Sequence, residues 1–502
     1  MPDNLGTIIW TLCYTAVLLG ISLYGLHRYF IVYLFLKNKR NVPQPLAKLE
    51  KLPKVTIQLP IFNELYVVER LLDSVSKLDY PRELIDVQVL DDSTDETREL
   101  ATKLVGELHT RGFDIRHIHR VDRTGFKAGA LENGLLSAKG EFILILDADF
   151  VPTPDVLKRT VDYFSDPKVG MIQTRWGHLN RTYSMLTRVQ AMFLDGHLLL
   201  EQTGRNRSGR FINFNGTAGV WRKSCIVEAG GWQHDTLTED LDLSYRAQLK
   251  GWQFVFLPEI ISPAEVPVDM NAFKSQQHRW AKGSIQTAKK LLPAILKSDL
   301  PYEVKKEAFL HLSNNVAYLL MVVLSVMMPL SMMLRFKQEL YVTLWLDLPV
   351  FVASTASVGF FYVATGRELG LNWWNRIKYL PFVMSLGIGM AVNQAKAVVE
   401  ALLDKQSEFT RTPKTGSEGK AVKAVKKAYR GKRSWVPLIE LAFGIYFTGA
   451  VWFAWTHEIW TSLPFLVLFQ SGFLYVGINS MLEFRGKAKA APQVDAAAQP
   501  TV

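Results

Sequence analysis

The chain has 502 residues, a length at which about one domain per ~150 residues predicts two to four units rather than one. Hydrophobic residues make up 48% of it and gather at the N-terminus and after about residue 310, which argues against a wholly soluble protein. The formal net charge is +11, much of it beside the apolar runs, which favours a lipid bilayer over nucleic acid as partner, and the two cysteines exclude a disulfide framework.

The N-terminal segment predicts a membrane anchor over residues 1–40. Residues 7–26 contain no Asp, Glu, Lys or Arg, and apolar residues resume over 29–36. This length is enough to cross ~30 Å of hydrocarbon and is too long for the core of a signal peptide. Basic residues at 37–40 place the C-terminal end of the anchor, and so the domain that follows, in the cytosol.

The region that follows alternates predicted strands with amphipathic helical stretches. Short runs rich in Val and Ile predict strands at 55–60, 87–92, 142–149 and 170–176, and helical stretches lie at 64–77 and 94–110. This alternation predicts an α/β domain over 41–290 with a mixed, mostly parallel sheet covered on both faces. Ligands of such sheets bind beyond the carboxyl ends of the strands, where three of the runs end in polar or acidic residues.

The second half predicts an α-helical membrane domain. Amphipathic segments at 282–298 and 302–310 precede apolar spans at 311–334, 341–364, 435–456 and 460–482. Polar residues interrupt the stretch 382–403. The α/β domain and the basic loop 405–434 should both be cytosolic, and the two spans between them already return the chain to that side. The stretch 382–403 is therefore expected to lie along the surface or to re-enter the membrane rather than cross it. We therefore expect five spans in all, or six if 382–403 crosses. The resulting divisions are 1–40, 41–290, 291–404, 405–434, 435–484 and a disordered tail at 485–502.

Acidic residues follow two of the predicted strands. Asp92 opens an Asp/Ser/Thr-rich turn, where it could bind a nucleobase or ribose, or cap the next helix. Asp147 and Asp149 follow a buried run, and two such carboxylates are costly together unless a cation lies between them. Mg²⁺ or Mn²⁺ on a diphosphate fits this pair, and a helix cap near residues 152–154 is the alternative.

Three further motifs have both a catalytic and a structural interpretation. Thr238, Glu239 and Asp240 open an amphipathic helix, so Asp240 could be a general base or a first-turn acid. Lys127 enters another helix and could meet a diphosphate or remain solvated. The stretch "FINFNGTAGVW" contains glycines that would let a ligand approach the backbone, or would form a simple turn; its loop residues are Asn215, Gly216 and Thr217.

The stretch "SQQHRWAKGS" is too polar for a core helix and too aromatic for a solvated one. Gln276, Arg279 and Trp280 are spaced so that all three can meet one ligand at a helical turn. An amide binds sugar hydroxyls, a guanidinium binds diphosphate, and an indole offers a flat face to a sugar ring. The alternative is a membrane-interface helix with a snorkelling arginine and an interfacial tryptophan.

In this order, the four motifs around Asp92, 147–149, 238–240 and 276–280 resemble the processive inverting glycosyltransferases of family 2, in the cellulose-synthase superfamily. Stretches such as "QVLDDSTD", "FNGTAGVWR" and "QQHRW" are similar to the cellulose-synthase-like A and C proteins, which make mannan or glucan backbones, and to their bacterial relatives. The resemblance covers 54–290 closely. It implies a GT-A-like, Rossmann-like cytosolic domain joined to helical spans.

The resemblance also implies a role for each motif. Asp92 would hold the nucleoside, Asp149 with Asp147 would bind the metal, and Asp240, supported by Thr238 and Glu239, would deprotonate the acceptor hydroxyl. The other donor-binding residues would be Pro60, Phe62, Glu64, Lys127, Gln276 and Arg279. The acceptor would meet Trp280 and the loop Asn215, Gly216 and Thr217. "EFTRTPKTG" is similar to a gating loop, with Phe409, Thr412 and Lys414 in the matching places.

We therefore expect a multi-pass enzyme that uses Mg²⁺ or Mn²⁺ to extend a β-glycan and move it across the membrane. UDP-glucose is the first donor expected and GDP-mannose the second, with the growing glycan as acceptor and no nucleic acid. The membrane would be a bacterial inner membrane or a eukaryotic endomembrane or plasma membrane. A glycosyltransferase that makes a glycolipid is the alternative enzyme, and a membrane scaffold with a nucleotide-binding-like domain is the non-enzyme alternative.

Overall fold

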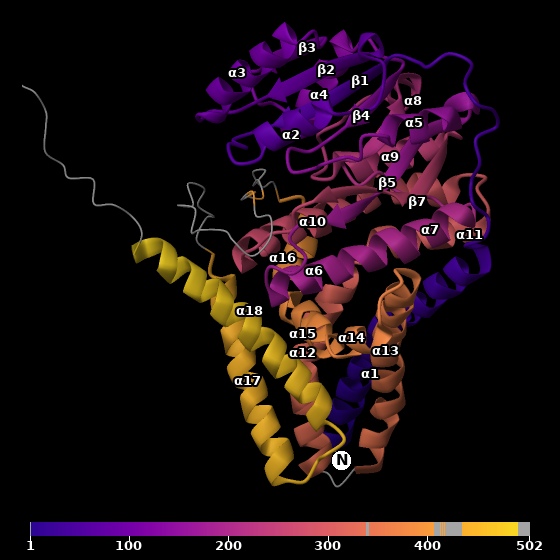
Figure 1. The fold of residues 1–502 in the computed structure, drawn as a ribbon. Helices are drawn as coiled ribbons and strands as arrows, with labels where there is room; N and C mark the ends of the chain where they lie inside the picture. Colours follow the sequence, from indigo (N-terminus) through magenta and orange to yellow (C-terminus); the bar gives the residue numbers. More distant parts are fainter. Residues whose placement is uncertain are drawn as a thin grey trace, which may run out of the picture.

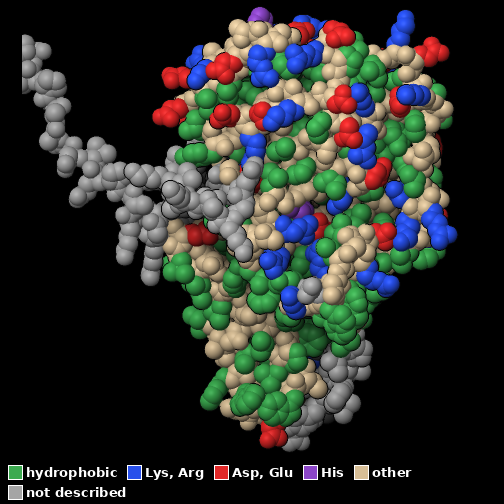
Figure 2. Space-filling view, in the orientation of Figure 1, with side chains coloured by type: hydrophobic (Ala, Val, Ile, Leu, Met, Phe, Trp, Pro, Cys, Tyr) green, Lys and Arg blue, Asp and Glu red, His purple; other side chains and the backbone are tan. Residues whose placement is uncertain are grey.

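The computed structural model describes residues 2–337, 341–405, 412, 414, 416 and 434–489. Figure 1 shows a sheet domain at one end and a bundle of long helices at the other, with the N-terminus at the far end of the bundle. In Figure 2 charged side chains gather over the sheet domain and hydrophobic ones over the helical end. This division agrees with the α/β domain and the membrane domain that the sequence predicts.

The α/β domain contains a seven-stranded sheet in the order β3-β2-β1-β4-β6-β5-β7. All neighbouring strands are parallel except β6, which runs antiparallel to both β4 and β5. The strands are β1 (Val55–Ile61), β2 (Ile85–Asp91), β3 (Ile115–His119), β4 (Phe142–Ile145), β5 (Val169–His178), β6 (Gly219–Arg222) and β7 (Gln253–Ala264). The mixed, mostly parallel sheet is confirmed.

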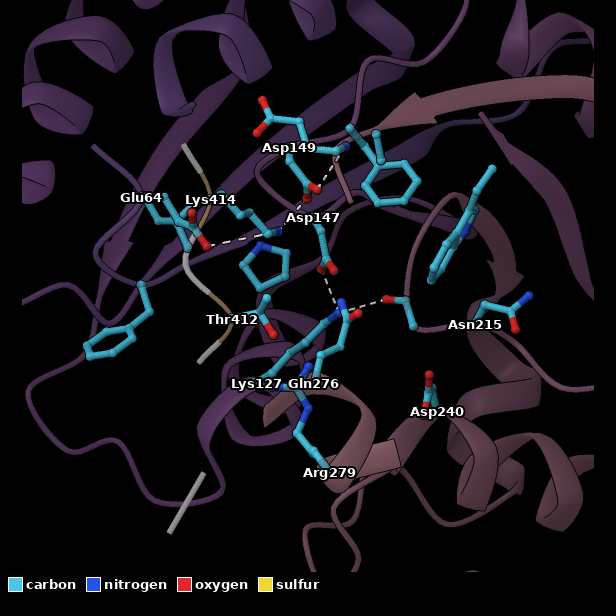
Figure 3. Close-up of a pocket in the computed structure, with 18 of the residues that line it drawn as sticks. Glu64, Lys127, Asp147, Asp149, Asn215, Asp240, Gln276, Arg279, Thr412 and Lys414 are labelled. Atoms are coloured by element: carbon cyan, nitrogen blue, oxygen red, sulfur yellow. Dashed lines mark hydrogen bonds and ion pairs between the residues drawn. The ribbon is translucent and has the colours of Figure 1, made fainter. Parts of the chain in front are cut away.

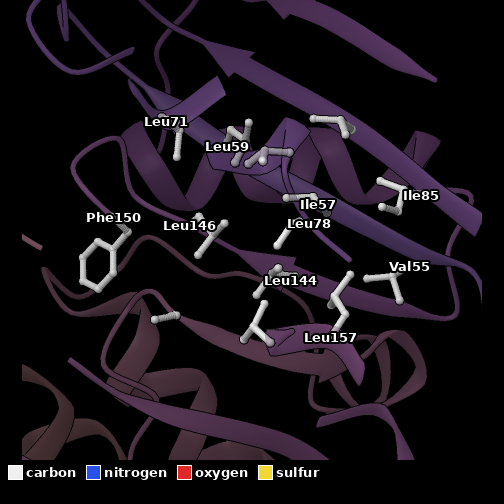
Figure 4. Packing of buried hydrophobic residues seen from close by; sticks show 14 of the residues in the cluster. Val55, Ile57, Leu59, Leu71, Leu78, Ile85, Leu144, Leu146, Phe150 and Leu157 are labelled. Carbon is white, nitrogen blue, oxygen red and sulfur yellow. The ribbon is translucent and has the colours of Figure 1, made fainter. Parts of the chain in front are cut away.

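Helices cover both faces of the sheet. On one face, the buried cluster drawn in Figure 4 packs side chains of β1 and β4 against α2 (Val68–Ser76) and α3 (Thr97–Thr110). On the other face, α4 (Phe126–Ser137), α8 (Lys223–Glu228) and α9 (Glu239–Leu249) pack against the sheet through a second cluster. The short helices of this domain that remain are η1 (Arg82–Leu84), α5 (Val156–Thr160), η2 (Val161–Ser165), α6 (Met185–Asp195), the π-helix η3 (Gly196–Gln202) and α7 (Thr203–Arg207).

The helical end starts with α1 (Pro2–Asn38), which packs against α12 (Val316–Lys337) and α13 (Tyr341–Glu368). The long helix α10 (Met270–Lys297) and α11 (Tyr302–Ser313) lie between the sheet domain and the bundle (Figure 1). Because α10 is continuous, the boundary expected at 290/291 falls inside a helix. The bundle also contains α14 (Trp373–Ile377), α15 (Leu380–Gly389), α16 (Ala391–Leu402), α17 (Val436–Thr456) and α18 (Leu463–Lys489).

Four helices in the described part of the chain are long and apolar enough to cross a membrane. They are Leu5–Asn38, Val316–Lys337, Val436–Thr456 and Leu463–Glu483. The expected span at 341–364 forms α13 but is not among the four; the side chains of residues 341–349 lie outside the description. The expected re-entrant stretch 382–403 forms α15 and α16, bent by 42° at their junction, and would be a fifth span if the pair crosses as one.

Candidate active site

One cavity beyond the carboxyl ends of β1, β2 and β4 collects most of the predicted site residues (Figure 3). The empty space in and before it is about 1280 Å³, open solvent at its mouth included. The predicted residues that line it are Pro60, Phe62, Glu64, Asp92, Lys127, Asp147, Asp149, Asn215, Gly216, Thr238, Glu239, Asp240, Gln276, Arg279, Trp280, Thr412 and Lys414.

Two predicted residues are not in this lining. Thr217 lies directly behind it, where its hydroxyl accepts a hydrogen bond of 2.8 Å from the backbone N–H of Asp147. Phe409 lies outside the described residues. Thr217 therefore supports the carboxylate loop rather than the ligand.

Asp147 and Asp149 follow β4, which ends at Ile145, so they lie in a turn and not in the strand expected to run to residue 149. Each carboxylate faces a different lysine. The Lys127 ammonium donates to Asp147 at 2.6 Å, and Lys414 forms an ion pair with Asp149. Neither aspartate caps a helix, because α5 begins at Val156 after Asp155.

The carboxylates and ammonium groups around this turn shift one another's pKa values. Burial alone would raise the pKa of Asp147, but the Lys127 and Lys414 ammonium groups hold it below its ordinary value. Burial alone would lower the pKa of Lys414, but Asp149, Glu64 and Asp147 raise it. Lys414 thus remains charged beside carboxylates that would otherwise repel each other.

The residues fit a divalent cation of the Mg²⁺ or Mn²⁺ type. Such ions are bound by one or two carboxylates together with substrate phosphates and water. The described residues contain no cluster of three or more histidine, cysteine or acidic side chains that could form a cage by themselves. The Asp147/Asp149 pair has the oxygen donors for a metal whose other ligands come from a diphosphate.

Asp92 lies at the cavity and does not cap the helix that follows it. Helix α3 begins after Glu96 and has no side-chain cap, so the alternative interpretation of Asp92 is wrong. Instead, Arg120 clamps the carboxylate with Nε at 2.9 Å and Nη2 at 2.6 Å. The guanidinium of Arg123 lies over the ring of Phe62, 3.4 Å from its centroid, and forms a shelf beside Asp92.

Asp240 lies in the first turn of α9 and lines the cavity. Its Oδ1 accepts from the backbone N–H of Leu241 at 2.8 Å, while its Oδ2 faces Gly216. Burial, and secondarily the negative charge of Glu239, raises the pKa of Asp240 to about 7. A carboxylate with this pKa can both lose and accept a proton near neutral pH, as a general base must.

The loop that holds Gly216 lies between Lys127 and Asp240. Gly216 has a φ of +81°, a backbone conformation that side chains other than glycine rarely adopt. Its carbonyl accepts from the Lys127 ammonium at 2.8 Å. The glycine therefore lets its loop approach both Lys127 and Asp240 closely. This is more than the simple turn that was the alternative interpretation of the sequence.

Gln276, Arg279 and Trp280 all lie on α10 and line the cavity. Burial lowers the pKa of Arg279, opposed by the carboxylates of Glu239, Asp147 and Asp240. Its charge is therefore directed at the carboxylates of the site rather than at a membrane surface. Trp280 lines the cavity together with Gln276 and Arg279, as one ligand-binding turn of the helix would require.

The sequence did not single out three residues of this cavity wall, Arg123, Trp176 and His178. It also did not single out Arg120, which binds the Asp92 carboxylate. Trp176 and His178 lie at the carboxyl end of β5, so the same strand-end rule that found Asp147 could have found them. His178 is buried, with its Nε2 3.3 Å from Asp195. No motif marks Arg120 and Arg123, because their importance depends on the distant Asp92 and Phe62.

A mixed, mostly parallel sheet with a carboxylate turn after a central strand, and a cavity at its carboxyl edge, defines a GT-A-type glycosyltransferase. The mannosyltransferase PcManGT from Pyrobaculum calidifontis, solved with GDP-Man and Mn²⁺, shares this fold. It superposes with a TM-score of 0.50 at 21% identity, over 80% of this chain and 100% of its own.

The sequence comparisons define the family. Residues 53–283 match the model "Glycosyltransferase like family 2". Probable glucomannan 4-beta-mannosyltransferase 9 of Oryza sativa subsp. japonica is 33% identical over 92% of this chain and 90% of its own. Glucomannan 4-beta-mannosyltransferase 1 of Cyamopsis tetragonoloba is 40% identical over 52% of this chain and 50% of its own. The chain belongs to the family-2 glycosyltransferases of the cellulose-synthase superfamily.

Proposed function

We propose that the chain transfers mannosyl groups from GDP-mannose to the end of a growing β-1,4-mannan or glucomannan. Its similarity to glucomannan 4-beta-mannosyltransferases over nearly its whole length supports this donor. The preference expected from the sequence, UDP-glucose before GDP-mannose, is thereby reversed, because those motifs alone do not distinguish the sugars.

The position of Asp240 carries the proposed chemistry. Its Oδ2 faces Gly216, whose carbonyl binds the Lys127 that also holds Asp147. In the proposed step, the acceptor hydroxyl gives its proton to Asp240, its oxygen bonds to the anomeric carbon, and the bond from that carbon to the diphosphate oxygen breaks. Attack opposite the leaving group inverts an α-linked donor to a β-linked product.

We assign the donor side of the cavity to the residues around the cations. Asp92 and the Phe62–Arg123 shelf would hold the nucleoside, with Pro60 and Glu64 beside it. Asp147 and Asp149 would hold Mg²⁺ or Mn²⁺, which supplies positive charge for the departing diphosphate. The same phosphates would be contacted by Lys127, Gln276 and Arg279. Lys414 and Thr412, on the segment expected to gate the site, would line the cavity beside them.

We assign the acceptor side to Trp280 and the loop at Asn215–Gly216, with Thr238 and Glu239 positioning Asp240. The sheet domain would be cytosolic, and the apolar helices would carry the elongating polymer through the bilayer. Because α10 carries Gln276, Arg279 and Trp280 and also reaches α16 and α18, it would join the site of synthesis to the path of export.

The decisive experiment incubates membranes containing the protein with radiolabelled GDP-mannose or UDP-glucose, each with Mn²⁺ or Mg²⁺. The expected product is a polymer that β-mannanase degrades, formed from GDP-mannose and absent from the Asp240→Asn variant. Label from UDP-glucose alone, in a β-glucanase-sensitive polymer, would refute the donor. Label that chloroform extracts would support the glycolipid alternative instead.

A further inference from the structure

The side-chain oxygen of Asn215, in the cavity wall beside Gly216, is surrounded by donors. Gln202 Nε2 lies 3.4 Å from this oxygen and Asn213 Nδ2 lies 3.0 Å from it. Both amides also donate to backbone carbonyls, which fixes their orientation. Gln202 Nε2 donates to the carbonyl of Asn213 at 2.8 Å, and Asn213 Nδ2 donates to the carbonyl of Phe214 at 3.1 Å. With these two amides fixed, the Asn215 carboxamide has one satisfactory orientation, with its oxygen toward them.

A third donor, His197, completes this set. His197 Nε2 donates to Asn215 Oδ1 at 3.2 Å, and His197 Nδ1 contacts Glu201 Oε2 at 3.0 Å. Both residues lie on the π-helix η3, a rare form of helix that is frequent at functional sites. The wider turn places His197 and Glu201 side by side next to the Asn215 loop.

Glu201 is itself held by a chain of buried polar contacts that begins in α1. His27 contacts Glu307 at 3.0 Å, and Arg205 donates to Glu307 at 2.9 Å and to Glu201 at 3.2 Å. Burial alone would raise the pKa of Glu201, but Arg205 and His197 hold it well below its ordinary value. Glu201 is therefore a fixed anion that orients the imidazole.

This orientation leaves the amide nitrogen of Asn215 without a hydrogen-bond partner in the described part of the chain. Asn215 Nδ2 is buried and has no hydrogen-bond partner among the described residues. The indole Nε1 of Trp176, in the same cavity wall, is also buried and unpaired within the described part of the chain. Buried donors of this kind cost free energy and are rarely left unpaired, so two in one wall indicate a ligand with oxygen acceptors.

The ligand these donors suit is the acceptor sugar rather than the donor diphosphate. Figure 3 shows Asn215 and Asp240 on one side of Asp147, and Glu64 and Lys414 on the other. Cations gather around Asp147, whereas Asn215 and Trp176 offer neutral N–H groups that match hydroxyl or ring oxygens. A neutral donor next to the base can bind an acceptor oxygen without neutralising Asp240.

We propose that Glu201 and His197 are positioning residues that fix the Asn215 amide so that its nitrogen, with Trp176 Nε1, binds an oxygen of the acceptor sugar. The inference rests on the proposed function, because the ligand is the end of the growing glycan. His197 itself touches no substrate and acts through Asn215.

The test measures KM for manno-oligosaccharide acceptors, KM for GDP-mannose, and kcat in solubilised full-length protein. His197→Leu is expected to raise the acceptor KM by ~10-fold with little change in donor KM, the loss of about one hydrogen bond. His197→Gln is expected to restore it, because the glutamine amide can donate from the position of Nε2. Trp176→Phe, which removes the other neutral donor, is expected to raise the acceptor KM by ~5-fold.

A double-substitution cycle separates positioning from general damage. Asn215→Ala and His197→Leu together are expected to match Asn215→Ala alone, since His197 acts only through that side chain. His109→Leu, an exposed histidine on α3, is the matched control and is expected to change nothing. GDP binding measures whether each variant keeps its fold.

Direct acceptor binding provides a readout without turnover. In the Asp240→Asn background, manno-oligosaccharide binding is expected to weaken ~10-fold with Asn215→Asp, which keeps the shape of the side chain but replaces the donor nitrogen with oxygen. Additive effects in the cycle, or unchanged oligosaccharide binding by Asn215→Asp, would overturn the inference. Failure of the wild type to use GDP-mannose or bind any manno-oligosaccharide would instead count against the proposed function.

Discussion

Gly216 and Asp240 lie so close that a Cβ atom on Gly216 would be 2.9 Å from Oδ2 of Asp240. The same Cβ would lie 3.6 Å from the Lys127 ammonium. We predict that Gly216→Ala displaces the base and lowers kcat by ~100-fold or more, since small displacements at a reacting centre cost that much. GDP binding should persist, because the nucleoside-binding residues lie elsewhere in the cavity.

Gly112 offers a matched control for backbone strain. Its φ of +85° is close to that of Gly216, but a Cβ at this position would have no atom within 4 Å. Gly112→Ala therefore introduces the same strained conformation without touching the site. If it lowers kcat as much as Gly216→Ala does, backbone strain and not contact with Asp240 explains the effect.

The raised pKa of Asp240 predicts how the rate depends on pH. A base with a pKa of about 7 is protonated and inactive below neutrality. We expect kcat/KM for the acceptor to rise about tenfold per pH unit up to pH ~7 and then level off. A rate that is flat between pH 5 and 7 would show that another group accepts the proton.

The same shift predicts an effect on stability. Because the folded pKa of Asp240 is above its unfolded value of ~3.9, its contribution to stability is fully present below pH ~4 and is lost as the pH rises through about 7. At pH 8 the half-buried carboxylate therefore destabilises the protein. Asp240→Asn should raise the melting temperature in detergent at pH 8 by a few degrees and have little effect at pH 4; the reverse order would contradict the assignment.

Lys414 occupies the Asp149 carboxylate to which we assign a divalent metal. The Lys414 ammonium forms an ion pair with Asp149 and lies 4.0 Å from Glu64. We predict that Lys414→Gln tightens Mn²⁺ binding to the nucleotide-free protein by ~10-fold, measured by calorimetry, and weakens GDP-mannose binding. Lys158→Gln, which breaks the exposed pair with Asp79, is the control and should change neither affinity.

Trp280 should set the length of the product. It lines the cavity from α10, the helix between the site and the bundle, where an indole can stack on the acceptor. Trp280→Ala should shorten the polymer several-fold in size-exclusion chromatography, and Trp280→Phe should retain most of the length because a flat ring remains. Equal polymer lengths in all three proteins would remove the stacking role.

The sequence predicts those strands that have a distinctive local composition. Four expected strands match β1, β2, β4 and β5, because each is a short run rich in Val and Ile. β3 was missed because "IRHIH" is basic and polar, and β7 because prolines at 258 and 263 argue against a strand. β6 was missed because its antiparallel place between β4 and β5 is a property of the whole sheet.

The residues of the candidate site also fall into those that local composition predicts and those that only the fold brings together. Motifs marked the carboxylates and the "QQHRW" helix, since each has an unusual local composition. The lysine partners of Asp147 and Asp149 could not be assigned, because Lys127 and Lys414 come from segments 287 positions apart in sequence that only the fold brings together. The chain of contacts from His27 to Asn215 could not be predicted either, because its residues are also distant in sequence.

The link between α10 and the bundle provides the last prediction. Lys274 and Glu440, both buried, form an ion pair of 2.7 Å between α10 and α17. Lys274→Met alone would leave a carboxylate buried without its partner and should cost ~3–5 kcal/mol of stability. Replacing both residues, as Lys274→Met with Glu440→Leu, should recover most of that loss, because the desolvation cost disappears with the second charge. Thermal unfolding in detergent measures both. If the double variant is no more stable than the single one, the pair stabilises the junction by its attraction and not merely by mutual neutralisation.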